Sequence, residues 1–162
     1  MSDPGPYRQS RSPVVDRLAE GLREQKFKHR EHPGEVRGVR ILGLLVKKTF
    51  NFNLAVIVLS LPSGRQAGPL AQELKRPIAE LAGYFFFLYT VGLQVVFVGQ
   101  SSESREDLQK FVDPINDPVC VLQSIHVLNA EGPPASVRTW GQIFTGRVQD
   151  EIERVLGSLA SA

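Results

Sequence analysis

The sequence predicts an α/β fold: a single domain with a mixed sheet of four or five strands, flanked by helices on both faces. Residues 69–110 have the order helix, glycine, buried strand, polar turn, helix, which is typical of such domains. Residues 52–61 are nearly all apolar, as expected of a strand covered on both faces. The chain has 162 residues, 42% hydrophobic and 22% charged, in the range of globular proteins.

The first third of the chain predicts a helix followed by a hairpin. Residues 1–11 are expected to form a flexible leader, and residues 12–162 the α/β domain. Ser12 and Pro13 suit the N-cap and first position of a helix that runs to about residue 27. A polar connector over 28–34 then leads to strands at 36–49 and 52–61, which we expect to pair as an antiparallel hairpin.

The helix after Pro69 has two possible ends. Pro77 lies inside its apolar pattern and should kink the helix or start a new one. In the preferred interpretation the helix continues through the aromatic residues 84–89 and stops at Gly92. In the alternative, Gly83 ends the helix and residues 84–90 pair with 93–99 across a turn at 91–92. The choice decides between four strands and five.

The rest of the chain completes the pattern. A strand is predicted at 93–99, and then a helix capped by Ser101 or Ser102 that ends near residue 112. A strand at 119–128 and a loop at 129–135 precede a closing helix over 138–159, whose apolar residues recur on one side.

Composition and motifs exclude several classes of protein. The single cysteine, Cys120, allows no internal disulfide and is expected to be a buried strand residue. Residues 81–102 carry no formal charge, but Gln94 and Gly92 favour a helix end and a strand over a membrane span. The first thirty residues lack the apolar core of a secretory signal. We therefore expect a soluble, intracellular protein in the cytoplasm, with no membrane partner.

The chain offers few ligands for a metal or cofactor. His29 and His32 lie three residues apart, but the only other histidine is His126, and a stable site needs three or four ligands. The sequence His32-Pro33-Gly34 is also a turn sequence. We expect no metal and no cofactor.

One candidate small-molecule site follows the predicted strand at 93–99. Gln100, Ser101 and Ser102 lie where open α/β sheets bind ligands, and His126 on the next strand is a further candidate. The turn matches neither a Walker loop nor a dinucleotide fingerprint. Acidic residues at the start of the following helix, Glu103 among them, would repel a phosphate.

The sequence gives no complete catalytic constellation. A metal-dependent nuclease with this order of elements would need a carboxylate near the hairpin and an acid–x–lysine step on the next strand, and residues 51–56 hold no carboxylate. The order therefore allows a nuclease-like fold that lacks a complete active site. No Gly-x-Ser-x-Gly motif occurs, so we lean against an enzyme.

Charge is unevenly distributed although the net charge is only +2. Residues 1–48 hold 11 Lys and Arg against 6 Asp and Glu, and the remaining residues hold 8 against 11. The basic third suits nucleic acid or another acidic partner, but interleaved acids also suit a solvated helix face. The candidate nucleic-acid-binding residues are Arg23, Lys26, Lys28, Arg30, Arg37, Arg40, Lys47 and Lys48.

These observations lead to three hypotheses for function. The first is a non-catalytic binding or assembly module that acts through protein–protein contacts, with a protein partner or as a homo-oligomer. The second is a nucleic-acid-associated domain that uses the basic third. The third is a small-molecule enzyme or sensor with its site at residues 100–104.

Overall fold

The computed structural model describes residues 12–49, 52–83, 90–112, 120–129, 132–139 and 146–161. The elements, in chain order, are α1 (Pro13–Leu22), β1 (Lys28–His29), β2 (Glu35–Val36), β3 (Val39–Lys48), β4 (Phe52–Ser60), α2 (Ala67–Leu81), β5 (Thr90–Val98), α3 (Arg105–Gln109), β6 (Cys120–Leu128), β7 (Ala135–Arg138) and α4 (Gly146–Ala160). The predicted flexible leader and the aromatic residues 84–89 lie outside the described residues.

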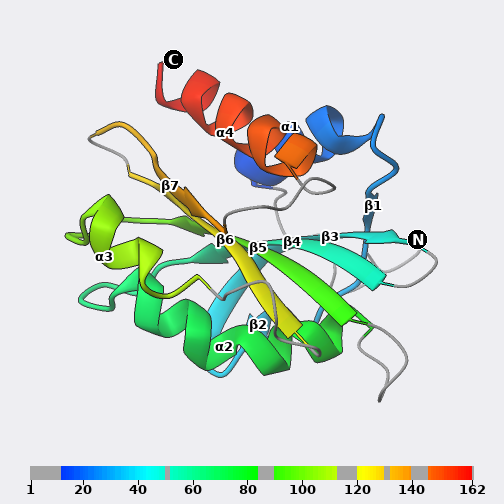
Figure 1. Cartoon of the computed structure of the whole chain (residues 1–162), viewed down its shortest axis with the longest axis horizontal. Coiled ribbons are helices and arrows are strands. Elements are labelled where there is room, and N and C mark those ends of the chain that lie inside the picture. Colours follow the sequence, from blue (N-terminus) through cyan, green and yellow to red (C-terminus); the bar gives the residue numbers. More distant parts are fainter. Residues whose placement is uncertain are drawn as a thin grey trace, which may run out of the picture.

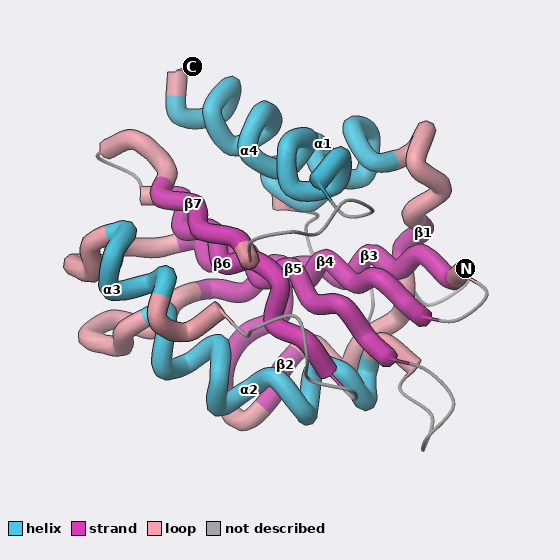
Figure 2. The backbone as a smooth tube through the Cα atoms, in the orientation of Figure 1, coloured by secondary structure: helices cyan, strands magenta, loops and turns pink. Residues whose placement is uncertain are grey.

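The elements form one mixed sheet with helices on both faces (Figures 1 and 2). The strand order is β1-β3-β4-β5-β6-β7, and β2 pairs with the beginning of β3. β3 and β4 form the predicted antiparallel hairpin, β4, β5 and β6 are parallel, and β7 is antiparallel to β6. The α/β class, the hairpin and the parallel strands are thus confirmed.

Two apolar clusters hold the layers together. On one face α1 and α4 cover the sheet, with Leu18 and Ile152 packed against a group that includes Val56 and Val96. On the other face α2 and α3 cover it, with Leu74 and Leu108 in the larger cluster. Successive side chains along β4 and β5 point to opposite faces and so belong alternately to the two clusters. Because both faces are covered, these strands are apolar almost throughout.

The predicted strand count of four or five is wrong, because the described residues alone form a sheet of seven strands. The additional strands are β1, β2 and β7, which have two, two and four residues. Each lies at the edge of the sheet or beside the beginning of β3, and few of their side chains are buried. Short edge strands carry no apolar alternation, so the pattern that predicts longer strands does not reveal them.

The expected ends of α2 are also corrected. The helix ends at Leu81, and Gly83, two residues later, adopts φ +87°. The preferred extension of this helix to Gly92 is therefore wrong. The alternative places this end correctly, but its turn at 91–92 is wrong because Val91 and Gly92 belong to β5. Gly92 serves packing instead of a turn: a Cβ there would lie 2.6 Å from Gln123 Oε1.

Pro77 neither starts a new helix nor interrupts α2. A proline lacks the N–H that would bond the carbonyl four residues earlier, here that of Glu73. The guanidinium of Arg37 takes that place, since its Nη1 donates to Glu73 O at 3.4 Å. A side chain from the β2–β3 turn therefore satisfies the carbonyl that the proline leaves open.

Three other helices are shorter than predicted. α1 ends at Leu22 instead of near residue 27, and Lys26 turns the chain with φ +69°. α3 has five residues, and Ser104, not Ser101 or Ser102, caps it. Among the described residues α4 begins at Gly146, and its predicted start at residue 138 is wrong because Arg138 belongs to β7. Its predicted apolar side from Val148 to Leu156 is buried as expected.

Candidate functional site

Basic side chains gather at the β1 edge of the sheet. They line a hollow of about 690 Å³, which we call the basic hollow. Its lining residues are Arg23, Lys26, Phe27, Lys28, His29, Arg30, Val46 and Lys48. Five of the eight predicted nucleic-acid-binding residues are among them, and no acidic residue is.

The pairing of β1 with β3 brings these residues together. Lys28 pairs with Val46 in an antiparallel register. Lys48 lies two residues further along β3, so its side chain projects from the same face as that of Val46. The turn after α1 adds Arg23 and Lys26 from the preceding segment.

The charged side chains that line the basic hollow are all positive. Arg23, Lys26, Lys28 and Lys48 are exposed, and none of them forms an ion pair with another residue in the described part of the chain. Arg30 is half-buried, and its Nη1 donates to the carbonyl of Ala82 at the end of α2, 3.5 Å away. Four exposed cations therefore line this hollow without an ion-pair partner among the described residues, which favours a positive potential at this edge.

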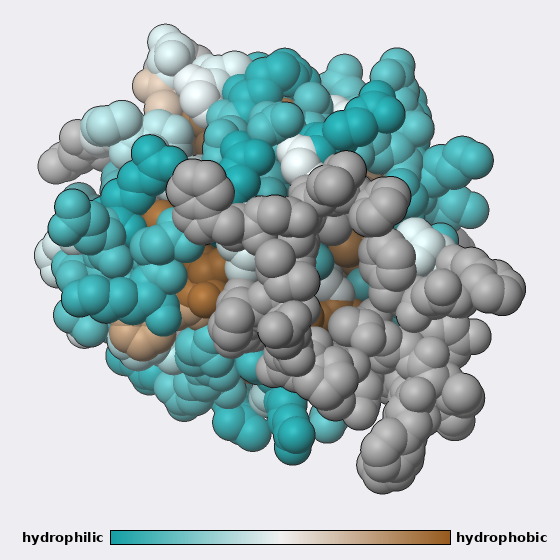
Figure 3. All heavy atoms as spheres, viewed as in Figure 1, coloured by the Kyte–Doolittle hydropathy of each residue, from teal (hydrophilic) through white to brown (hydrophobic). Residues whose placement is uncertain are grey.

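The backbone at Lys26 turns the chain after α1. Its φ of +69° lies in the left-handed region that glycine adopts most readily. The N–H groups of Lys26 and Phe27 donate to Arg23 O and Leu22 O, which closes the end of the helix. In Figure 3 the surface over β1 and the turn before it is hydrophilic.

The other three predicted basic residues do not join the basic hollow. Arg37 is engaged with Glu73 O below α2. Arg40 lies near the beginning of β3, eight residues or roughly 27 Å from Lys48 along the strand. Lys47 projects from the opposite face of β3 because strand side chains alternate.

The predicted small-molecule residues of the turn after β5 lie in a second hollow, at the carboxyl ends of β4, β5 and β6. Gln100, Ser101 and Ser102 line about 850 Å³ together with Gln66 and Asn129. The polar atoms of Ser101 are already used: its N–H donates to Asn129 Oδ1 at 3.2 Å, and its Oγ donates to Glu103 Oε1 at 3.2 Å. Both crossover helices, α2 and α3, cover the same face, so the diverging crevice of nucleotide-binding sheets does not form here.

Glu103 fills the anion position at the start of α2. Its two carboxylate oxygens accept hydrogen bonds from Gly68 N at 3.2 and 3.1 Å. The sequence predicts that Glu103 repels a phosphate, but not that it binds the neighbouring helix. The nearby α3 is capped internally, because Ser104 and Asp107 exchange hydrogen bonds.

Replacing Gly68 with alanine is expected to lower the free energy of unfolding by about 1–3 kcal/mol. The added Cβ would overlap the ring of Phe111 and lie 2.8 Å from Glu103 Oε2, so the carboxylate would leave the helix start. Urea unfolding measures the change. Gly146→Ala is the matched control, since Gly146 also lies in a first helical turn and has open space around it. Equal stability of the two variants would contradict the packing described at Gly68.

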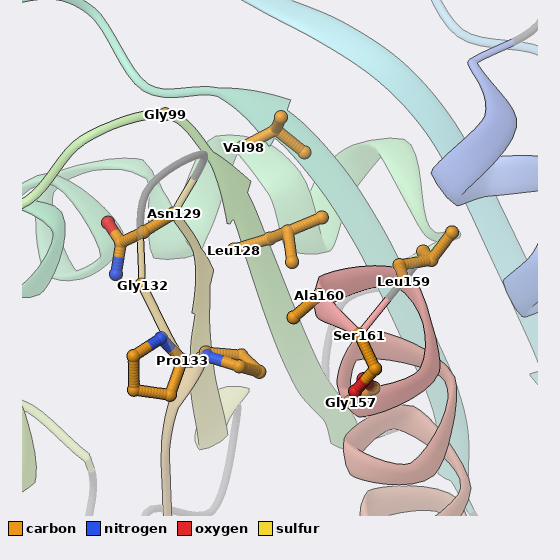
Figure 4. Close-up of a pocket in the computed structure, with 11 residues that line it drawn as sticks. Val98, Gly99, Leu128, Asn129, Gly132, Pro133, Gly157, Leu159, Ala160 and Ser161 are labelled. Atoms are coloured by element: carbon orange, nitrogen blue, oxygen red, sulfur yellow. The ribbon is translucent and has the colours of Figure 1, made fainter.

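A third hollow of about 780 Å³ lies between the sheet and the end of α4 (Figure 4). Val98, Leu128 and Leu159 project into it, each half-buried. Asn129 and Pro133 line both this groove and the hollow at residues 100–102. It offers aliphatic contact surface and few polar groups.

His126 lies apart from all three hollows. Its side chain is fully buried, with Nδ1 2.8 Å from Ser136 Oγ and Nε2 2.9 Å from Ser124 Oγ. Burial, with a smaller effect of Arg138, lowers the pKa of His126 to about 3. The ring is therefore neutral and has no free nitrogen for a ligand.

His126 belongs to a buried polar network that the sequence does not reveal. Ser124 Oγ donates to Gln94 Oε1 at 2.6 Å, and Gln94 Nε2 donates to Gln123 Oε1. Gln149 of α4 donates to the same Gln94 oxygen at 3.4 Å. The one sequence signal is a glutamine inside the apolar run of β5. Its partners come from β6 and α4, which only the fold brings close.

Comparison with known proteins adds no name to these sites. No protein-family model, no curated protein and no solved structure matches the chain. Within the described ranges, no three His, Cys, Asp or Glu side chains are grouped so as to hold a metal ion. Nor does any helix of the described part combine the length and apolar character needed to cross a membrane.

Proposed function

We propose that the chain is a non-catalytic binding module that binds nucleic acid through the basic hollow. The observation that carries the proposal is the convergence of Arg23, Lys26, Lys28 and Lys48 on one concave surface without an acidic neighbour in its lining. Exposed, unpaired Lys and Arg side chains that contact phosphates displace the counterions condensed on the nucleic acid, and their release drives binding that does not depend on base sequence.

The proposal assigns no catalytic step to the chain. The histidine that sequence reasoning singles out, His126, is buried and bonded at both ring nitrogens. A general base must reach the proton that it removes. The role that fits the basic hollow is therefore binding, with any chemistry left to another protein.

Action through protein contacts, with a protein partner or a second copy, stays a prediction. The aliphatic groove at the end of α4 is the surface that would serve it (Figure 4). The basic hollow is preferred because its charge specifies the chemistry of a ligand, whereas a small aliphatic groove does not.

The test compares the protein with two triple variants. Lys26→Gly, Lys28→Gln and Lys48→Gln together remove three charges from the basic hollow, and glycine suits the φ of +69° at residue 26. We expect affinity for a fluorescent oligonucleotide to fall at least about tenfold in about 50 mM salt.

The control variant carries Arg40→Gln, Arg76→Gln and Arg105→Gln. These three arginines are exposed and lie outside the basic hollow, so the net charge changes by the same three units. Fluorescence anisotropy should give this variant nearly the affinity of the unmodified protein. An equal loss in both variants would reduce the effect to overall charge, and no binding by the unmodified protein would remove the proposal.

A further inference from the structure

We infer, resting on the function proposed above, that Arg30 is a phosphate-binding residue of the basic hollow and that the end of α2 holds it in place for this contact. Arg30 lines the basic hollow beside Lys28 and is half-buried. The four exposed cations supply charge, whereas Arg30 supplies a guanidinium whose position is fixed before a ligand arrives.

Arg30 and Lys28 face the same ligand because they project from the same face at the edge of the sheet. Lys28 pairs with Val46, and the N–H of Arg30 donates to Leu44 O at 2.9 Å, so the pairing with β3 continues to residue 30. Side chains two residues apart on a strand point to the same side, and their Cα atoms are roughly 7 Å apart. Val46 belongs to the apolar cluster on the α2 side of the sheet. Both cations, together with Lys48, therefore project on that side.

The guanidinium of Arg30 is held at two points. Its Nη1 donates to the Ala82 carbonyl at 3.5 Å. A Cβ added at Gly83 would lie 3.0 Å from Nη1 and 3.2 Å from Nη2, so the guanidinium lies close against that glycine. A side chain that is ordered before binding loses less conformational entropy when the ligand arrives. Exposed lysines, in contrast, must be ordered as they bind.

Arg30 keeps donors for a ligand. A guanidinium has five N–H groups, and in the described part of the chain only Nη1 has a hydrogen-bond partner. The fork of N–H groups matches two oxygens of one phosphate, whereas the ammonium of a lysine acts as a point charge. The bond to Ala82 O also satisfies a carbonyl at the end of α2, but it uses one donor of five. The remaining donors are the ones that we assign to phosphate.

The experiment compares two arginine-to-lysine variants by fluorescence anisotropy, with a labelled DNA strand of about 16 nucleotides at about 50 mM salt. Arg30→Lys keeps the charge and loses the fork, so we expect binding to weaken about fivefold. Arg37→Lys is the matched control, because Arg37 also donates to a carbonyl of α2 but lies outside the basic hollow. It should bind like the unmodified protein. Arg30→Gln, which also loses the charge, should weaken binding at least about tenfold.

The outcomes separate this inference from the function on which it rests. Normal binding by Arg30→Lys would show that the fork is not used, and would overturn the inference while nucleic-acid binding stands. Equal weakening of Arg30→Lys and Arg37→Lys would trace the loss to α2 and would also overturn it. Failure of the unmodified protein to bind the strand would overturn the proposed function as well. Urea unfolding of the three variants verifies that each is folded.

Discussion

Replacing Gly92 with alanine should lower the free energy of unfolding by about 2–6 kcal/mol. The added Cβ would lie 2.6 Å from Oε1 of Gln123 and 2.7 Å from its Cδ and Nε2. Overpacking of this kind costs about 1–3 kcal/mol. Moving the Gln123 amide would also leave Gln94 Nε2, on a residue with no exposed surface, without its acceptor, which costs a further 1–3 kcal/mol or so.

Urea unfolding with two companion variants isolates the cause. Gly157→Ala is the control, because Gly157 lies in α4 with open space around it, and it should stabilise the protein by about 0.5–1 kcal/mol. In the double variant, Gln123→Ala removes the amide that Gly92→Ala displaces, so the two losses should not add. If Gly92→Ala were as stable as the unmodified protein, Gln123 would not pack against Gly92.

The stability of the protein should fall by about 2 kcal/mol between pH 7 and pH 5 because of His126 alone. The pKa of this buried histidine is lowered to about 3 in the folded protein, against 6.5 for the free side chain. Between these values the unfolded chain binds a proton that the folded chain does not. The stabilisation is therefore fully present above pH 6.5 and is lost as the pH falls towards 3.

Urea unfolding at a series of pH values tests this expectation. His126→Gln should be less stable at pH 7, because it loses contacts with Ser124 and Ser136, but its stability should change far less with pH. His29→Gln, at an exposed histidine, is the control variant. His32, whose pKa burial also lowers, adds a pH dependence of the same sign to all three proteins. Equal slopes with and without His126 would contradict its burial as a neutral ring.

The features of the fold that come from local pattern were predictable, and those that come from distant packing were not. The apolar run at 52–61 predicts a covered strand, and residues 53–59 of β4 are all buried. In the sequence Gly92 resembles the end of a helix. In the fold a glycine is needed there because the Gln123 side chain, 31 residues away, occupies the space of a Cβ. Nothing near Gly92 in the chain carries that information, so the start of β5 was misplaced.

The candidate site was predictable as a set of residue types but not as a surface. The sequence groups Arg37 with the other basic residues. In the fold its guanidinium instead donates a hydrogen bond to the Glu73 carbonyl, which receives none from Pro77 because proline has no N–H. Arg30 likewise contacts the end of α2 through Ala82. The register of β1 on β3 selects which cations converge, and a two-residue strand leaves no pattern to read.

The salt dependence of single-strand binding tests the central claim most directly. Each phosphate contact contributes about −0.7 to the slope of log K against log salt for a single strand. Four exposed cations, Arg23, Lys26, Lys28 and Lys48, therefore predict a slope of about −3 between about 50 and 200 mM salt.

The variant with Lys26→Gly, Lys28→Gln and Lys48→Gln should bring that slope to about −1, while the variant with Arg40→Gln, Arg76→Gln and Arg105→Gln should leave it near −3. A slope near −1 for the first variant and near −3 for the second would show that the phosphates of the nucleic acid contact the basic hollow. A slope that is the same in all three proteins, or flat in the unmodified one, would contradict the claim that this edge of the sheet binds nucleic acid.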